Sequence, residues 1–296
     1  MRSTAVGATS AATGTESVAL GAGSVADFAN SIVIGGGAYY DNGNNVGGIS
    51  AIAIGTNADA NAASAIAIGT NVSATDVGNV SIGLNTSSNG LESVAIGESA
   101  HADGTHSTAI GAQADATGIG STAIGWKADA SQTSATALGN STKATAVEAT
   151  ALGRNSTAIA ADATAVGFSA DATAAGAVAL GANAQGNGLN SVAIGNAATN
   201  TTFANSVALG NGTANTAGNQ VAVGGQTIAT ARTVTGVAAG ALNATSFEAV
   251  NGSQLFATNQ SIAANAAADG VQNTRLTSLE AADIAFDNRL DRVDRR

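Results

Sequence analysis

Short apolar segments recur along the first 224 residues at nearly constant spacing. Most read Ser or Ala, any residue, Ala, then Ile, Leu or Val, and end in Gly, as in SVAIG at 93–97, and the segments SIVIG at 31–35, NVSIG at 79–83 and QVAVG at 220–224 are close variants. Sixteen such glycines define fifteen intervals, of which thirteen are 14 residues long. Spacing this regular is the sequence signature of a stacked repeat protein. The glycines are interpreted as structural turn residues, among them Gly21, Gly97, Gly111, Gly125, Gly139 and Gly195.

Each repeat predicts two short strands and two turns. In an extended segment the side chains of Val94 and Ile96 share one face, and those of Ser93 and Ala95 share the other. Frequent glycine and β-branched residues at these positions disfavour helix. Because one such coil cannot bury its own face, the coils are expected to stack in parallel. The predicted fold is an all-β parallel β-roll, or solenoid, of 14-residue repeats.

The Ile, Leu or Val before each glycine is expected to point inward, together with the Val, Ile or Thr two residues earlier. Five consecutive coils carry threonine at that second position, namely Thr108, Thr122, Thr136, Thr150 and Thr164. Burial of apolar surface stabilises a fold by about 25 cal/mol per Å², and a coil this slender buries little of it. We therefore expect the Ala-rich face to pack against other chains and the protein to be an oligomer.

The repeat ends after Gly224, and the composition changes beyond it. Residues 1–225 are assigned to the roll, 226–260 to a neck or connector and 261–296 to a helical coiled coil. Large apolar residues of the last segment follow the spacing of a coiled-coil core, with Asp283 at the one remaining core position. A short helix is weak alone, which favours a parallel bundle. The predicted core is Leu276, Leu279, Phe286, Leu290 and Val293.

Charge and composition exclude several classes of protein. The net charge of −10 opposes binding to nucleic acid, which requires a basic surface. The absence of Cys excludes disulfides, and no apolar run approaches the ~18 residues that a membrane helix needs. Residues 1–3 lack the hydrophobic segment of a secretion signal, so an exported parent protein is expected to be longer than this chain.

Residues with catalytic or metal-binding chemistry are sparse. His101 and His106 flank Asp103 within one repeat, but a third ligand is missing, so no metal is predicted. No Ser has a His–Asp arrangement with a meaningful spacing, and no Gly-rich loop opens a helix. The sequence therefore predicts neither an enzyme nor a cofactor.

Stacking is expected to align the fourth residue after each glycine in one outer column. In successive coils this residue is His101, Asp115, Asp129 and Lys143. Because adjacent carboxylates repel, the column is expected to be fully exposed. Trp126, directly after a repeat glycine, is interpreted as a packing residue of a turn or a contact point for a partner.

The order of repeats, connector and helix resembles the trimeric autotransporter adhesins of Gram-negative bacteria. Residues 93–107 are similar to the repeat of a head of the Yersinia-adhesin type, and VAAG at 237–240 with AVNGSQL at 249–255 resembles the family's neck. The resemblance implies a left-handed roll, a homotrimer, and a neck that includes Val250, Asn251, Gln254 and Leu255. It also implies a coiled-coil stalk, with membrane attachment only through a C-terminal barrel outside this chain. The implied location is the bacterial cell surface and outer membrane, and the implied partners are host extracellular matrix or cell-surface molecules.

Two features are candidates for ligand binding. The family often carries Asn before the Ser of the repeat, and here Asn30, Asn190 and Asn205 stand at that position. The 20-residue interval between Gly35 and Gly55 contains an insertion, residues 36–49, with Tyr39 and Tyr40. Tyrosine is a common contact residue at interfaces, whereas loops also absorb extra length at little cost.

Three other functions stay open beside attachment to host matrix, cells or surfaces. The stacked roll and its helix would act as a structural spacer if a separate distal domain bound the ligand. A small-residue solenoid with a threonine ladder also suggests ice binding, although the expected interior position of the threonines and the helical tail oppose it. A polysaccharide-degrading β-helix is disfavoured because the sequence has no carboxylate cluster.

Overall fold

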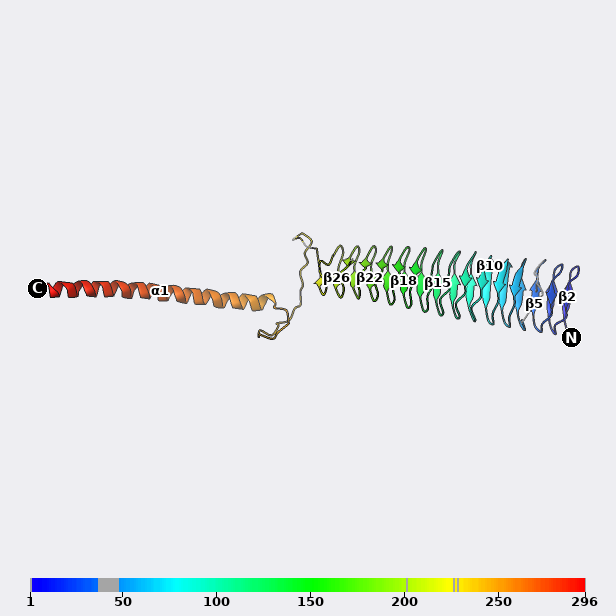
Figure 1. Cartoon of the computed structure of the whole chain (residues 1–296), viewed down its shortest axis with the longest axis horizontal. Helices are drawn as coiled ribbons and strands as arrows, with labels where there is room; N and C mark the ends of the chain where they lie inside the picture. Colours follow the sequence, from blue (N-terminus) through cyan, green and yellow to red (C-terminus); the bar gives the residue numbers. More distant parts are fainter. Residues whose placement is uncertain (1, 37–47, 201, 226, 228, 296) are drawn as a thin grey trace. The chain divides into compact units, whose positions relative to one another are not determined.

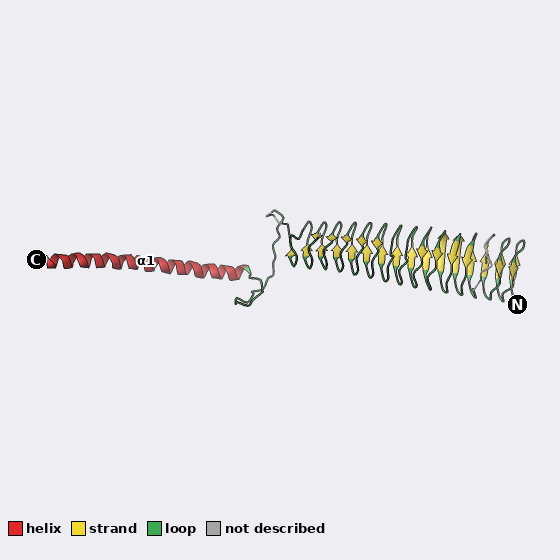
Figure 2. Cartoon of the chain, viewed as in Figure 1, coloured by secondary structure: helices red, strands yellow, loops and turns green. Residues whose placement is uncertain are grey.

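A computed structural model describes residues 2–36, 48–200, 202–225, 227 and 229–295. The chain divides into two compact units, Met1–Arg232 and Thr233–Arg296. The first is a stack of β-coils and the second contains one long helix (Figure 1, Figure 2). The roll predicted for residues 1–225 and the helix predicted near the C-terminus therefore fall in separate units.

One face of the roll is a 16-stranded parallel sheet. Each strand pairs with the equivalent residues of the next coil, as Thr108, Ala109 and Ile110 pair with Thr122, Ala123 and Ile124. The strands in spatial order are β1 (Thr4–Val6), β3 (Val18–Leu20), β5 (Ile32–Ile34), β6 (Ile52–Ile54), β8 (Ile66–Thr70), β10 (Val80–Leu84), β12 (Val94–Ile96), β14 (Thr108–Ile110), β15 (Thr122–Ile124), β16 (Thr136–Leu138), β18 (Thr150–Leu152), β20 (Thr164–Val166), β22 (Val178–Leu180), β24 (Val192–Ile194), β26 (Val207–Leu209) and β27 (Val221–Ala222).

The opposite face consists of shorter parallel strands in sheets of two, four and five strands. Isolated bridges that join His101, Asp115, Asp129 and Lys143 connect the last two sheets. The prediction of two short strands per repeat is thus confirmed. The strands of this face are β2 (Ala11–Ala12), β4 (Val25–Ala26), β7 (Ala58–Ala60), β9 (Val72–Ala74), β11 (Ser87–Ser88), β13 (His101–Ala102), β17 (Lys143–Ala144), β19 (Thr157–Ala158), β21 (Asp171–Ala172), β23 (Gln185–Gly186) and β25 (Thr199–Asn200).

The interior of the roll is built from alanine and serine, which corrects the sequence-based assignment of faces. Ala95, Ala100 and Ala102 of one coil are fully buried, as is Ser93. The neighbouring Val94 and Ile96 point to the outer face and are only half buried. The two layers of a coil lie so close together that the interior is filled mainly by methyl and hydroxymethyl groups, with a few larger buried side chains such as Val72 and Asn79. The expectation that Ile, Leu and Val form the inner ladder was therefore wrong.

The glycine that ends each segment has a backbone conformation that other residues rarely adopt. Gly125 has φ of +132°, and a Cβ built there would lie 2.2 Å from the carbonyl oxygen of Gly139 in the next coil. The same clash with the glycine one coil further on is found at Gly97 and Gly111. The glycine is therefore required both by its own conformation and by the close approach of successive coils.

A second turn signal recurs every seven residues. The residue that directly precedes the first inward-facing position of each extended segment has φ between about +50° and +75°, in the left-handed helical region. Asn and Gly tolerate this conformation, and Asn57, Asn71 and Asn85 are examples. Their side chains also form a hydrogen-bonded ladder, with Nδ2 of Asn57 donating to Oδ1 of Asn71 at 3.0 Å and Nδ2 of Asn71 donating to Oδ1 of Asn85 at 3.1 Å.

Ala197 is the one alanine among these left-handed residues in the described chain, with φ of +51°. Its replacement by Gly is expected to stabilise the roll by about 0.5–1 kcal/mol, because the steric cost of the left-handed conformation exceeds the entropic cost of glycine. The matched control is Ala182→Gly, since Ala182 does not have positive φ. Thermal denaturation checks the pair: a rise in Tm for Ala182→Gly that equals that for Ala197→Gly contradicts the explanation.

Arg232 closes the C-terminal end of the roll. Its Nη1 donates to Oγ1 of Thr213 at 2.7 Å and to the carbonyl of Val223 at 2.8 Å, and its Nη2 donates to the carbonyl of Asn211 at 2.7 Å. The guanidinium thus satisfies acceptors of the last coils that have no further coil to pair with.

Replacement of Arg232 by Lys is expected to lower the free energy of local unfolding of the last two coils by about 1–3 kcal/mol, because an ammonium cannot reach all three acceptors at once. Hydrogen exchange at the amides of 207–223 measures the effect. Unchanged protection there, with Arg2→Lys as the control for the charge type, contradicts the role of Arg232 as a cap.

The second unit joins a short connector to the helix α1 (Gly252–Asp294). Asn251 caps the helix: its side chain accepts from the amide of Gln254, and the Gln254 side chain accepts in return from the amide of Asn251. The Gln254 side chain also holds Gly240, accepting from its N–H at 3.0 Å and donating to its carbonyl at 2.6 Å. These contacts place three predicted neck residues, Asn251, Gln254 and Leu255, at the helix start. The helix therefore begins nine residues before the predicted boundary at 261.

Candidate binding surface of the roll

The outer face of the 16-stranded sheet carries a continuous row of Ile, Leu, Val and Thr. Leu138, Leu152, Leu180 and Leu209 are 40–46% exposed in the single chain. The five-coil threonine ladder lies on this same face, at the first position of β14, β15, β16, β18 and β20. The predicted interior position of the ladder was wrong, so that argument against ice binding is removed. This surface, here called the sheet face, is an extended apolar area that one chain leaves partly uncovered.

The charged column predicted on the opposite face is present, since parallel bridges join His101 to Asp115, Asp115 to Asp129 and Asp129 to Lys143. Asp115 and Asp129 are half buried rather than fully exposed. Oδ1 of each is buried without a hydrogen-bond partner. Burial raises the pKa of Asp115, and the carboxylates of Asp129 and Asp103 raise this pKa further, while His101 lowers it.

Replacement of Asp115 by Asn is expected to stabilise the roll slightly at pH 7, by less than about 1 kcal/mol because solvent screens the site. The folded state raises the pKa of Asp115, so its ionised form opposes folding at neutral pH. The gain is expected to vanish as the pH falls below the ordinary value of 3.8, where the folded and unfolded states both hold the proton. Thermal denaturation from pH 3 to 7 measures it. A gain that grows toward low pH, or an equal gain from Asp103→Asn, contradicts this cause.

One edge of the roll carries an apolar ridge. It consists of residues eight positions after the repeat glycine that are 37–59% exposed, namely Val77, Leu91, Ile119, Val147 and Leu189. Thr105 and Thr133 lie at the same position in the coils between Leu91, Ile119 and Val147. Leu91, Ile119 and Val147 therefore lie two coils apart from one another, at about 10 Å, whereas Val77 and Leu91 lie on adjacent coils. The sequence contains this signal as the 28-residue spacing of Leu91, Ile119 and Val147, which lie outside the strand segments.

The structure separates the predicted ligand-binding residues. Asn30, Asn190 and Asn205 are exposed, but Asn30 lies near the N-terminal end and the other two lie on adjacent coils near the C-terminal end. All three adopt left-handed φ, at +60°, +51° and +52°, so the conformation of the turn explains the choice of Asn. Tyr39 and Tyr40 lie outside the described residues.

Neither a metal centre nor a membrane helix is found in the described part of the chain. No group of three His, Cys, Asp or Glu within it is placed to hold a metal ion. His106 instead pairs with Glu92 of the preceding coil at 3.4 Å, with both side chains exposed. None of the described helices combines the length and the apolar character needed to cross a bilayer.

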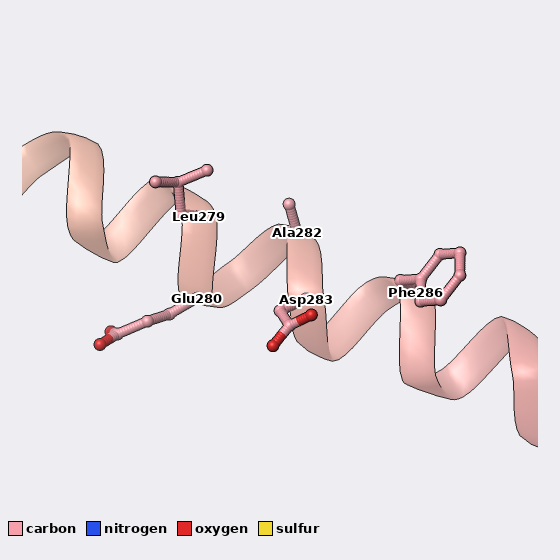
Figure 3. Close-up of a pocket in the computed structure, with 5 residues that line it drawn as sticks. All are labelled: Leu279, Glu280, Ala282, Asp283 and Phe286. Atoms are coloured by element: carbon pink, nitrogen blue, oxygen red, sulfur yellow. The ribbon is translucent and has the colours of Figure 1, made fainter.

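The predicted coiled-coil core is exposed on α1 in the single chain. Leu276, Leu279, Phe286, Leu290 and Val293 are all more than half exposed. Figure 3 shows Leu279, Ala282 and Phe286 along one side of the helix, while Glu280 projects away from them. Near the end of the helix, Arg295 forms an ion pair at 3.6 Å with Asp291, which lies four residues earlier.

Comparison with known proteins identifies the family to which the repeats of the roll belong. The model of the YadA head domain repeat, which holds two copies of the repeat, matches residues 1–24, 12–38, 47–71, 88–114, 116–142, 144–170, 158–184, 172–198 and 187–213. These segments together cover more than half of the chain. The chain belongs to the YadA head repeat family. The 14-residue coil of this family is the unit described above, and the YadA-type head is an adhesin passenger of the trimeric autotransporter class.

A solved structure is also similar to this YadA-type chain. It is the crystal structure of the collagen-binding domain of the Yersinia adhesin YadA, which is 25% identical, with 72% of this chain and 84% of that chain covered and a TM-score of 0.27. No match is found among curated proteins. The family to which the chain belongs consists of non-enzymatic adhesins.

Proposed function

We propose that three copies of this chain associate through the sheet face. The observation that carries the proposal is the row of Ile, Leu, Val and Thr that runs along the whole 16-stranded sheet and is only half buried in one chain. An apolar surface of this extent marks an association site. Because every coil repeats the same residue types, identical chains side by side bring like positions together at each level.

The charges of α1 support a parallel arrangement of the same copies. When Leu276 and Leu290 occupy core position a, Arg275 and Arg289 fall at position g, and Glu280 and Asp294 fall at position e five residues later. In a parallel coiled coil in register, position g of one helix meets that e position of its neighbour, so each arginine faces an acid. The predicted core residues on the same helix are then covered.

The trimer is proposed to be a surface-exposed adhesin whose roll binds extracellular matrix or cell-surface molecules of the host. The family assignment supports adhesion, and the solved relative named above is described as collagen-binding. The apolar ridge supports an elongated partner, since Leu91, Ile119 and Val147 present equally spaced contacts along the stack. A structural spacer that carries a distal binding domain is the alternative function.

Binding of the purified full chain to surfaces coated with collagen, laminin or fibronectin tests the function. The expected result is saturable binding that falls about tenfold in the variant Leu91→Ser/Ile119→Ser, with Ile159→Ser as the control at an exposed isoleucine outside the ridge and the sheet face. Light scattering is expected to give three times the chain's mass. A trimer that binds none of these surfaces favours the spacer.

A further inference from the structure

We propose that the middle of the roll holds a binding site for acidic polysaccharides, formed by Trp126, Lys127, Arg154 and Phe168. Trp126, Arg154 and Phe168 each directly follow a repeat glycine, and Lys127 is the next residue after Trp126. Their coils are in parallel register through β15, β16, β18 and β20. At the spacing of adjacent strands the row from Trp126 to Phe168 spans about 14 Å. The inference rests on the proposed adhesive function, for which it names a ligand class.

In this row of Trp126, Lys127, Arg154 and Phe168, here called the cationic–aromatic row, each aromatic ring stacks against one cation. Nζ of Lys127 lies 4.4 Å from the centre of the Trp126 ring, and Cζ of Arg154 lies 4.4 Å from the centre of the Phe168 ring. The rings remain 45% and 41% exposed. Because stacking restrains the long side chains, less entropy is lost when their donors engage an anion.

The charges of the row are uncompensated. Of the five basic residues in 1–260, three lie between 127 and 154, and Arg232 is engaged in the cap. In the described chain the ion pairs are His106–Glu92 and Arg295–Asp291, so Lys127 and Arg154 face no carboxylate within salt-bridge distance. Lys143 lies apart on the opposite sheet, in the column beside Asp129. The row therefore presents two cations without an ion pair on an acidic protein.

The fold does not require large residues at this position. The residue after the repeat glycine is Ala112 and Ala182 in nearby coils, and Glu98 precedes the row by two coils. The residue before the glycine, by contrast, is Ile, Leu or Val in every coil. A position so variable in size and charge does not pack against a repeating neighbour. The aromatic residues are thus available for a ligand.

Aromatic rings and paired cations in one row suit a sulfated or carboxylated polysaccharide. Arginine presents a planar fork that matches carboxylate or sulfate oxygens, and sugar rings stack on exposed aromatic faces. The net charge of −10 opposes nucleic acid, so an acidic sugar chain is the occupant that the observations favour.

The test is binding of the full chain to immobilised heparin and hyaluronate, with neutral dextran as the reference surface. We expect binding that weakens as salt rises, and a loss of about tenfold in Lys127→Gln/Arg154→Gln. Trp126→Ala is expected to lose several-fold, while Trp126→Phe keeps most of the binding because it keeps a ring. Leu84→Ala, in the same column, and Arg2→Gln, with the same change of charge as Arg154→Gln, are expected to bind normally.

Several results overturn the proposal: no binding to either acidic sugar, equal binding to dextran or to duplex DNA, or an equal loss in Arg2→Gln. Collagen, laminin and fibronectin are measured with the same samples. Binding to one of those proteins without binding to the acidic sugars removes this site and leaves the adhesive function standing. Binding to the acidic sugars alone supports the site and shows that the coated proteins were not the target.

Discussion

Gly125→Ala is expected to open the middle of the roll and lower Tm by about 10 °C. Alanine at this position would have to keep a φ of +132°, which side chains rarely allow. Its methyl group would also meet the carbonyl oxygen of Gly139 at 2.2 Å. The strain of the conformation and the forced separation of two coils are together expected to destabilise each chain by about 3–5 kcal/mol. Circular dichroism on heating gives Tm, and hydrogen exchange locates the opening at β15 and β16.

The matched control is Gly120→Ala in the same coil. Gly120 also has positive φ, at +64°, but a Cβ there has no atom within 4 Å. Only the cost of the left-handed conformation remains, about 1–2 kcal/mol. Equal losses of stability in the two variants contradict the view that the repeat glycine is set by the distance between coils.

Ala95→Asp and Ile96→Asp are expected to separate folding from association. Ala95 is fully buried in the roll, so a carboxylate there has no partner and is expected to unfold the coils around it, at a cost of several kcal/mol. Ile96 lies on the sheet face, so its replacement leaves the single roll intact and disrupts the contact between copies.

Light scattering and circular dichroism distinguish the two outcomes. Ile96→Asp is expected to give folded monomers at low concentration, whereas Ala95→Asp is expected to lose strand signal. If Ile96→Asp unfolds the roll and Ala95→Asp only dissociates it, the two faces are assigned the wrong way round. Ala95→Ser is the control, because serine occupies buried positions such as Ser93 in the same coil.

The repeat could be predicted because a parallel stack aligns residues that are one period apart. The register of Thr108 with Thr122 and the column from His101 to Lys143 both follow from the 14-residue spacing alone. The Asp291–Arg295 pair likewise follows from helical spacing. These features depend only on local periodicity, which the sequence displays directly.

The choice of inner and outer face did not follow from the sequence. Alternation places Ala95 and Ile96 on opposite faces, and the usual preference buries the larger residue. Here the narrow interior of the coil, which is filled mainly by Ala and Ser, decides instead. The helix α1 itself begins within the predicted connector, at Gly252, because Asn251 and Gln254 form a capping box there.

Each coil forms its main-chain hydrogen bonds with the coils directly before and after it, as when the amide of Thr122 donates to Ala135 and the amide of Gly125 donates to Ile110. Excision of fourteen residues would therefore join two surfaces that already match. Loss or duplication of a fourteen-residue unit would shorten or extend the molecule in whole coils. The length of the roll is in this sense a heritable variable that can change without redesign of any single coil.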